Sequence, residues 1–222
     1  NARLEDVVGG IDERAAAHDR MRVRRGILAQ ADRNILYIDE INLLSDEIID
    51  SILDAAAQGS YTVRRGPLAA TYRSRFVLVG SMNPEEGRLR PQILDRFGLR
   101  VIVKGLEDAG ERLEAYRRVN AWLENPRQMI AQFSAEMEAA ADEIRSARER
   151  VKNVRLPDKV ANPAIHLVQK MGVDSLRAEI TWFEAARAYA AADGREEVTS
   201  EDLKAVAPMT LRLRRSSYMN EY

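Results

Sequence analysis

Two adjacent carboxylates follow an apolar run in the sequence NILYIDEINLL, residues 34–44. The apolar residues 35–38 predict a strand buried on both faces, of the kind found in parallel sheets. Asp39 and Glu40 come directly after it, where ligand sites lie in open α/β sheets and where two charges are costly to bury unless a cation or reacting group uses them. The pair indicates hydrolysis of a nucleoside triphosphate, with Asp39 helping to hold Mg²⁺ and Glu40 polarising the attacking water. The alternative is a strand that ends in an acidic turn.

A second apolar run carries an amide shortly after its end. Residues 76–81 read FVLVGS and are followed by MNP. Pro84 keeps Asn83 out of a helix, so we expect Asn83 at the carboxyl end of a second buried strand. An Asn-Pro pair is by itself ordinary turn chemistry. Beside Asp39 and Glu40, however, the Asn83 amide could orient the attacking water.

A helix and a hairpin are expected between these two strands. Ser45 predicts the start of the helix and Gly59 its end, with apolar residues at positions 48, 49, 52, 53 and 56 on one face. Residues 61–73 then predict a β-hairpin around the turn at Gly66. The arms of this hairpin carry four arginines, which are either solvated or contact a partner: Arg64, Arg65, Arg73 and Arg75.

Strands and helices alternate only as far as residue 104. A short helix over 91–97 precedes a third predicted strand over 99–103. Beyond it the pattern predicts helices alone, at about 107–123, 126–151, 162–171, 175–192 and 200–207. The apolar stripe along 126–151 is typical of a core seam. The chain is therefore expected to form an α/β core, residues 1–104, followed by an all-helical domain, residues 105–222.

Composition narrows the classes of function. Apolar residues make up 45% of the chain and charged residues 31%, as in ordinary globular proteins, and the net charge is −1. A net charge near zero makes nucleic acid a poor candidate partner. The absence of cysteine excludes disulfides and thiolate chemistry from these residues. No apolar run approaches the length of a membrane span, so we expect a cytoplasmic protein without a membrane partner.

The motifs resemble those of AAA+ ATPases. ILYIDEINLL resembles the Walker B strand and VLVGSMNPEEG the sensor 1 strand, while LRPQILDRFGL resembles the arginine-finger segment and GVDSLRAE, residues 172–179, the sensor 2 motif. With the basic hairpin, they are most similar to the motor subunit of magnesium chelatase, subunit I, in a group that includes MoxR-type ATPases. The resemblance covers essentially the whole chain. It implies an α/β fold, a partial P-loop NTPase core with a parallel sheet followed by an all-helical lid.

The resemblance implies roles for individual residues and the cofactors ATP and Mg²⁺. Asp39 would bind Mg²⁺ and Glu40 would be the general base. Asn83 would be sensor 1, and Arg177 would be sensor 2, which couples the lid to the nucleotide. Arg96 would reach into the ATP site of a neighbouring subunit as the arginine finger. The alternative for Arg96 is a cation that stabilises a helix end, and for Arg177 a surface arginine.

The same resemblance implies an assembly and a reaction. The subunits would form a homo-oligomeric ring, expected to be a hexamer, because Arg96 acts in trans. ATP hydrolysis would drive insertion of Mg²⁺ into protoporphyrin by a partner chelatase or von Willebrand factor A-type subunit. Two alternatives are a MoxR-like chaperone that remodels a partner protein and an AAA+ scaffold without hydrolysis. A motor that acts on DNA would be supported only by the arginines of the hairpin.

One family motif does not occur in these residues. The sequence contains no GxxxxGK[ST] loop, which in P-loop proteins cradles the β- and γ-phosphates. The family's sheet has the strand order 5-1-4-3-2, and the predicted strands correspond to 3, 4 and 5. A sheet without its central strand would leave backbone groups unpaired. We therefore expect these residues to belong to a longer polypeptide or to pair with a separate piece.

Overall fold

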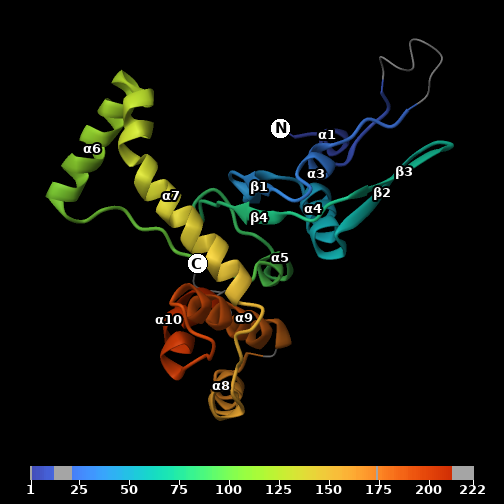
Figure 1. Ribbon diagram of the computed structural model, residues 1–222. Coiled ribbons are helices and arrows are strands. Elements are labelled where there is room, and N and C mark those ends of the chain that lie inside the picture. Colours follow the sequence, from blue (N-terminus) through green and yellow to red (C-terminus); the bar gives the residue numbers. More distant parts are fainter. Residues whose placement is uncertain (1, 13–21, 174, 212–222) are drawn as a thin grey trace. The chain divides into compact units, whose positions relative to one another are not determined.

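The computed structural model describes residues 2–12, 22–173 and 175–211 (Figure 1). It divides into two compact units, Asn1–Arg96 and Phe97–Tyr222. The sequence predicts the boundary after residue 104, because the apolar segment 99–103 reads as a strand of the core. Asp174, within the predicted sensor 2 motif, lies outside the described residues.

The first unit contains the elements expected around the two apolar runs. In chain order these are α1 (Leu4–Val8), α3 (Ile27–Gln30), β1 (Ile35–Ile38), the 3-10 turn η1 (Ile41–Leu43), α4 (Asp46–Gln58), β2 (Ser60–Arg65), β3 (Leu68–Arg73), β4 (Val77–Gly80) and α5 (Pro91–Arg96). The second unit is helical: α6 (Ala109–Glu124), α7 (Pro126–Arg150), α8 (Asp158–Lys170), α9 (Leu176–Ala192) and α10 (Ser200–Thr210). Among these helices, none has both the length and the apolar character needed to cross a membrane.

Strands β1 and β4 pair in parallel, which confirms both predicted strands. Their register runs from Ile35 opposite Val77 to Ile38 opposite Gly80. One face of this pair packs on a cluster from α1, α3 and α4, whose buried members are Val7, Leu28, Ile48, Ile52 and Ala55. On the other face the side chains are 43–67% exposed: Ile35, Tyr37, Val77 and Val79. The prediction of burial on both faces is wrong for the described residues, because their elements cover only one face.

Helix α4 and the hairpin confirm the predicted connection between the strands. The helix buries Ile48, Ile49, Ile52, Leu53 and Ala55 on one side. It ends at Gly59, whose φ of 68° lies in the left-handed region that favours glycine. Ser45 stands at the amino end, as predicted, but its side chain makes no capping hydrogen bond. Strands β2 and β3 pair antiparallel on either side of Gly66.

The third predicted strand does not form. Residues 99–103 have no regular secondary structure, and Leu99, Val101, Ile102 and Val103 are 48–89% exposed. The backbone N–H of Arg100 donates to the carbonyl of Met209 at 2.9 Å. A strand needs a neighbour along its whole length to satisfy its backbone groups, and no described strand lies beside this segment.

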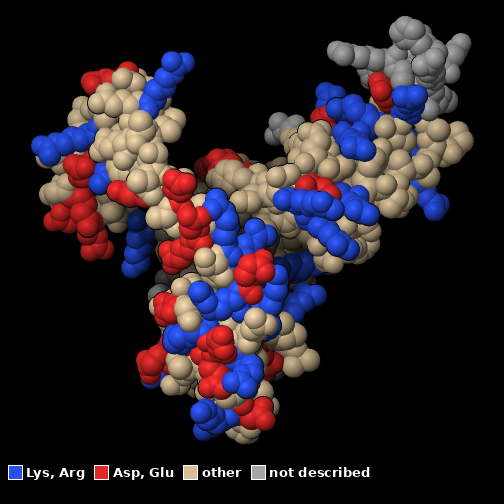
Figure 2. All heavy atoms as spheres, in the orientation of Figure 1, with Lys and Arg blue, Asp and Glu red and all other residues tan. Residues whose placement is uncertain are grey.

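Helices α6 and α7 form a hairpin with an exposed apolar surface. Asp108 and Asn125 cap the two helices through their side chains. Neither helix contains a buried residue, and Ile130, Met137 and Ile144 on α7 are 60–70% exposed. Uncharged side chains accordingly form a continuous stretch on this hairpin in Figure 2. The predicted core seam is therefore wrong for most of α7. Ala147, near its C-terminal end, and Val151, directly after it, pack on the apolar cluster formed by α8, α9 and α10.

The three helices α8, α9 and α10 enclose the larger core of the second unit. Small residues on α9 allow close packing, since Ala178, Ala186, Ala190 and Ala191 are all buried. The indole N–H of Trp182 donates to the carbonyl of Leu203 at 2.7 Å, which joins α9 to α10 and leaves no unpaired donor on the buried ring. These helices confirm the predicted helical lid.

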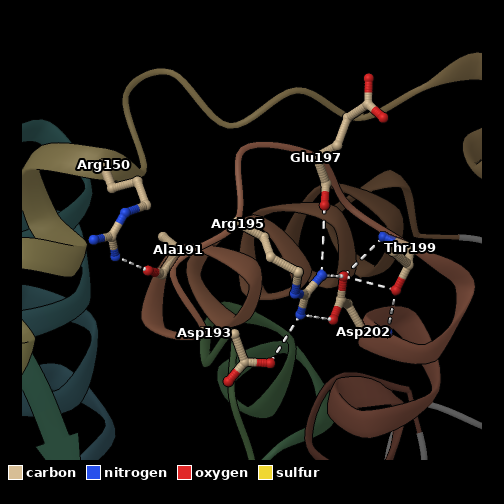
Figure 3. A network of polar contacts seen from close by, with 7 residues as sticks. All are labelled: Arg150, Ala191, Asp193, Arg195, Glu197, Thr199 and Asp202. Carbon is tan, nitrogen blue, oxygen red and sulfur yellow. Dashed lines mark hydrogen bonds and ion pairs between the residues drawn. The ribbon is translucent and has the colours of Figure 1, made fainter.

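A buried carboxylate holds the start of α10 (Figure 3). Asp202 is 2% exposed and accepts two hydrogen bonds from the guanidinium of Arg195, at 2.5 and 2.6 Å. It also forms a capping box with Thr199, and Arg195 contacts Asp193 at 2.9 Å. The Arg195 guanidinium holds the pKa of the Asp202 carboxyl below its ordinary value, against the opposing effect of burial. Asp202 is therefore a buried charged group, stabilised by the Arg195 guanidinium and by hydrogen bonds from Thr199.

We expect Asp202→Asn to lower the free energy of unfolding of the second unit by about 2–3 kcal/mol, because it breaks a buried ion pair. Urea denaturation followed by the fluorescence of buried Trp182 would measure this. Glu201→Gln is the matched control, since the neighbouring pair of Glu201 with Lys204 is exposed, and its effect should stay within about 0.5 kcal/mol. Equal effects of the two substitutions would contradict the assignment.

Candidate functional site

The predicted acidic pair lies at the carboxyl end of β1, beside the end of β4. Asp39 Oδ1 accepts a hydrogen bond from the Ser81 hydroxyl at 2.5 Å and another from the Tyr37 hydroxyl at 2.9 Å. The bonds from Ser81 and then Tyr37 lower the pKa of the Asp39 carboxyl below its ordinary value. Asp39 is therefore an anion at neutral pH. Both hydroxyl bonds end on Oδ1, so Oδ2 accepts from neither hydroxyl.

Glu40 adopts a backbone conformation that is unusual for its residue type. Its φ of 51° and ψ of 52° place it in the left-handed region, which costs a residue with a Cβ about 1–2 kcal/mol. Its N–H donates to the Ser81 hydroxyl oxygen at 3.1 Å, and the N–H of Ile41 donates to the Ser81 carbonyl at 2.9 Å. The strand is thus turned sharply at Glu40, whose exposed carboxylate has no hydrogen-bond partner in the described part of the chain.

Asn83 stands at the same edge of the sheet, in a loop tied to the end of β1. Its side-chain oxygen accepts from the N–H of Glu85 at 3.1 Å, which is the turn chemistry expected for an Asn-Pro pair. The Asn42 amide nitrogen donates to the carbonyls of Asn83 and Gly87, at 3.3 and 3.4 Å. This loop therefore brings Asn83 to the edge that carries Asp39 and Glu40.

Three residues of this site were missed by the sequence analysis, namely Tyr37, Asn42 and Ser81. Tyr37 was counted as part of the apolar run and Asn42 as part of INLL, although each carries a polar group. Ser81 is the first polar side chain after β4, and parallel strands that end at one edge would bring it beside Asp39. The position of Ser81 directly after the second apolar run could therefore have predicted its place beside Asp39.

Arg96 is held on α4 rather than at the acidic pair. It is the last residue of α5, and its Nη1 lies 2.7 Å from Asp54 Oδ1. Arg90 pairs with Asp50, one helical turn before Asp54 on α4, at 3.1 Å. It also pairs with Asp46, two turns before Asp54, at 3.2 Å. These ion pairs fix α5 against α4. Within the described residues, no ion pair joins the Arg96 guanidinium to Asp39 or Glu40.

Arg177 belongs to the second unit. It is the second residue of α9 and is exposed. The neighbouring Ala178 is fully buried in the lid core. Arg177 is therefore an exposed side chain at the amino end of a helix that is packed in the core of the second unit.

The residues of this edge fit one part of a Mg²⁺–nucleotide site. Mg²⁺ in phosphoryl-transfer sites is held by one or two carboxylates together with the phosphates of the substrate, and anionic Asp39 has an oxygen to offer. The described residues contain no group of three or more His, Cys, Asp and Glu that could hold a metal by itself. The phosphate loop GxxxxGK[ST] does not occur in the chain. These residues therefore offer carboxylate oxygens of the kind that Mg²⁺ prefers, and the GxxxxGK[ST] loop is not among them.

Comparison with known proteins gives matches over most of the chain. Residues 15–91 match the family model of magnesium chelatase, subunit ChlI, and residues 162–221 match that of an AAA lid domain. The chain is 44% identical over 220 residues to the magnesium-chelatase subunit ChlI homolog of Methanocaldococcus jannaschii, which covers 98% of this chain and 60% of that protein. It is also 44% identical over 214 residues to the magnesium-chelatase 38 kDa subunit of Acidiphilium rubrum, with 96% and 62% covered. The chain thus spans about three fifths of the length of these relatives.

The fold also resembles a solved structure. A crystal structure of a protein from Cytophaga hutchinsonii, assigned as an ATPase, matches with a TM-score of 0.69 and 20% identity, over 96% of this chain and 67% of that one. At this identity the likeness shows the fold alone. It confirms the predicted fold class, an α/β core with a parallel sheet followed by a helical lid.

We expect Asn42→Ala to loosen the loop over residues 83–87, because the loop loses two hydrogen bonds that tie it to the end of β1. Amide hydrogen exchange in the loop should quicken by about 5–30-fold, which corresponds to one or two kcal/mol. Asn34→Ala is the control, since the side-chain bond of Asn34 is a local one to the carbonyl of Asp32, and the substitution leaves its backbone bonds in place. Equal exchange in both variants would show that Asn42 does not hold the loop.

Proposed function

This chain belongs to the magnesium-chelatase subunit I family of AAA+ ATPases, and we propose that it carries the hydrolytic centre of an ATP-driven ring motor. The observation that supports this most is the acidic pair at the end of β1. Asp39 is kept anionic by two hydroxyl bonds that both end on Oδ1. Glu40 is turned out of the strand, and its carboxylate has no hydrogen-bond partner among the described residues. A scaffold without hydrolysis would need neither arrangement.

The side chains of this edge would divide the work of hydrolysis. Asp39 would hold the cation through the carboxylate oxygen that accepts neither hydrogen bond, and Glu40 would accept the proton of the attacking water. Asn83 would orient that water through its amide nitrogen, because its side-chain oxygen already accepts from Glu85. Bound Mg²⁺ would neutralise charge on the phosphates of ATP. Arg177 would report the state of the nucleotide to the lid.

Arg96 would complete the site of a neighbouring subunit. A guanidinium that contacts the γ-phosphoryl oxygens stabilises the charge of the transition state. Arg96 is anchored on α4 by Asp54, and α5 is anchored by Arg90. These ion pairs hold Arg96 at a partly exposed position against α4, from which it would reach across a subunit interface. The active form would therefore be a homo-oligomeric ring, which we expect to be a hexamer.

The names of the relatives support a more specific role. The proteins from Methanocaldococcus jannaschii and Acidiphilium rubrum are named as a magnesium-chelatase subunit homolog and a magnesium-chelatase subunit. We propose that hydrolysis by this ring drives a partner chelatase subunit to insert Mg²⁺ into protoporphyrin. In this proposal the inserted Mg²⁺ is a substrate, separate from the Mg²⁺ that accompanies ATP.

The test is a mixture of two inactive variants of the protein that carries this chain. Glu40→Gln should lower the rate of ATP hydrolysis by about 10²–10⁴-fold, because it removes the general base. Arg96→Ala should lower it by about 10³-fold or more. When the two are mixed in equal amounts, some interfaces join an intact Glu40 to an intact Arg96, about a quarter of them by random assembly. Hydrolysis should then recover to a corresponding fraction of the wild-type rate.

Two outcomes would contradict the proposal. A mixture as inactive as its components would show that Arg96 does not act on a neighbouring subunit. Wild-type rates in the Glu40→Gln variant would show that the acidic pair is not the hydrolytic centre. Arg88→Ala is the matched control for loss of an arginine near α5, and it should leave hydrolysis within about twofold of wild type.

A further inference from the structure

We propose that Ser81 is the positioning residue of the acidic pair, and that its single hydroxyl sets the place of both carboxylates. The proposal rests on the proposed function for its consequence in hydrolysis, but its structural part stands on contacts of the described residues. Ser81 directly follows β4, whereas Asp39 and Glu40 directly follow the paired strand β1. It has no role of its own in the chemistry.

Four hydrogen bonds join Ser81 to consecutive residues of the other strand. Its N–H donates to the carbonyl of Ile38 at 3.0 Å, and its carbonyl accepts from the N–H of Ile41 at 2.9 Å. Its hydroxyl donates to Asp39 at 2.5 Å and accepts from the N–H of Glu40 at 3.1 Å. Ser81 thus binds each residue from Ile38, the last residue of β1, to Ile41.

The chemistry of a hydroxyl makes the two side-chain bonds interdependent. A serine hydroxyl has one proton to donate and lone pairs to accept with. The carboxylate of Asp39 can only accept, and the backbone N–H of Glu40 can only donate. The Ser81 hydroxyl therefore acts as donor to Asp39 and as acceptor from Glu40 at the same time. A movement of Asp39 that shifts this hydroxyl also disturbs its bond to Glu40, and the reverse holds for a movement of Glu40.

These bonds offset the strain at Glu40. The left-handed conformation of Glu40 persists only if the surrounding structure holds it. Of the bonds that Ser81 makes, the one from the Glu40 N–H acts on this residue directly. Without the hydroxyl, the backbone at Glu40 is free to relax toward an extended conformation, which would carry its carboxylate away from its place. Asp39 would lose the stronger of its two hydroxyl contacts at the same time.

Tyr37 provides an internal comparison. Its hydroxyl donates to the same oxygen of Asp39 at 2.9 Å, and it makes no bond to Glu40 in the described residues. Removing this hydroxyl should affect the place of Asp39 alone. Removing the Ser81 hydroxyl should affect both carboxylates. A comparison of variants at Tyr37 and Ser81 therefore separates an effect on cation binding by Asp39 from an effect on the general base Glu40.

The experiment compares Ser81→Ala, Ser81→Thr and Tyr37→Phe in the protein that carries this chain. Three quantities are measured: amide hydrogen exchange at Glu40 without nucleotide, Mn²⁺ affinity in the presence of ATP by electron paramagnetic resonance, and kcat and KM for ATP. In Ser81→Ala we expect faster exchange at Glu40, with Mn²⁺ affinity and kcat each about 10–100-fold lower and KM for ATP within about twofold of wild type. Ser81→Thr keeps the hydroxyl and should recover most of each quantity.

Tyr37→Phe should behave differently. We expect Mn²⁺ affinity to fall by about tenfold while the exchange rate at Glu40 stays at the wild-type value. Thermal unfolding of each variant shows whether it folds. The backbone bonds of Ser81 remain in Ser81→Ala, so its Tm should stay within a few degrees of wild type, about 2–4 °C.

The results distinguish failure of this proposal from failure of the proposed function. Unchanged exchange at Glu40 in Ser81→Ala, with unchanged Mn²⁺ affinity, would overturn the role of Ser81 whatever the rate of hydrolysis. A loss that Ser81→Thr does not restore would also overturn it, because the hydroxyl would not be the cause. A wild-type protein without ATP hydrolysis, but with exchange and Mn²⁺ affinity that depend on Ser81, would overturn the proposed function and keep the positioning role.

Discussion

The parallel ladder between β1 and β4 is the constraint on which the candidate site depends. It places the carboxyl ends of both strands at one edge, with Ile38 opposite Gly80. Asp39 then follows β1 and Ser81 follows β4, and the Ser81 hydroxyl donates a 2.5 Å hydrogen bond to the Asp39 carboxylate. A shift of the ladder by one residue would turn each side chain to the other face and separate this pair. The burial of one face against α1, α3 and α4 fixes that register.

Large apolar side chains are exposed in several places in the described part of the chain. The outer face of β1 and β4, the segment 99–103 and the exposed side of α7 each carry large apolar side chains that no described element covers. Burial of such side chains contributes about 25 cal/mol per Å², so each surface would be stabilised by a covering element.

The sequence predicted the elements of the fold better than their environment. Periodicity identified β1, β4, α4, α7 and the β2–β3 hairpin, because these patterns are local to the segment. It could not predict that one face of β1 is exposed, since burial depends on which elements are present to cover it. The strand predicted over 99–103 failed for the same reason, because a strand exists only with a neighbour.

The candidate site was predictable in part. Asp39, Glu40 and Asn83 were found because charged and amide groups follow apolar runs, and the structure places them at one edge of the sheet. Ser81 and Asn42 were missed, because their roles come from hydrogen bonds between segments about forty residues apart, such as the bond from Asn42 to the carbonyl of Asn83. Tyr37 was hidden inside an apolar run although its hydroxyl contacts Asp39. The roles of Arg96 and Arg177 remain proposals that rest on the family resemblance.

The proposed function requires that the edge formed by β1 and β4 hold the cation of a nucleotide. The most direct measurement is anomalous diffraction from Mn²⁺ in crystals of the protein that carries this chain, grown with a non-hydrolysable analogue of ATP. We expect the anomalous peak within coordination distance of the Asp39 carboxylate, with the terminal phosphate of the analogue facing Glu40. A bound analogue whose Mn²⁺ peak lies away from Asp39 would contradict the proposed function.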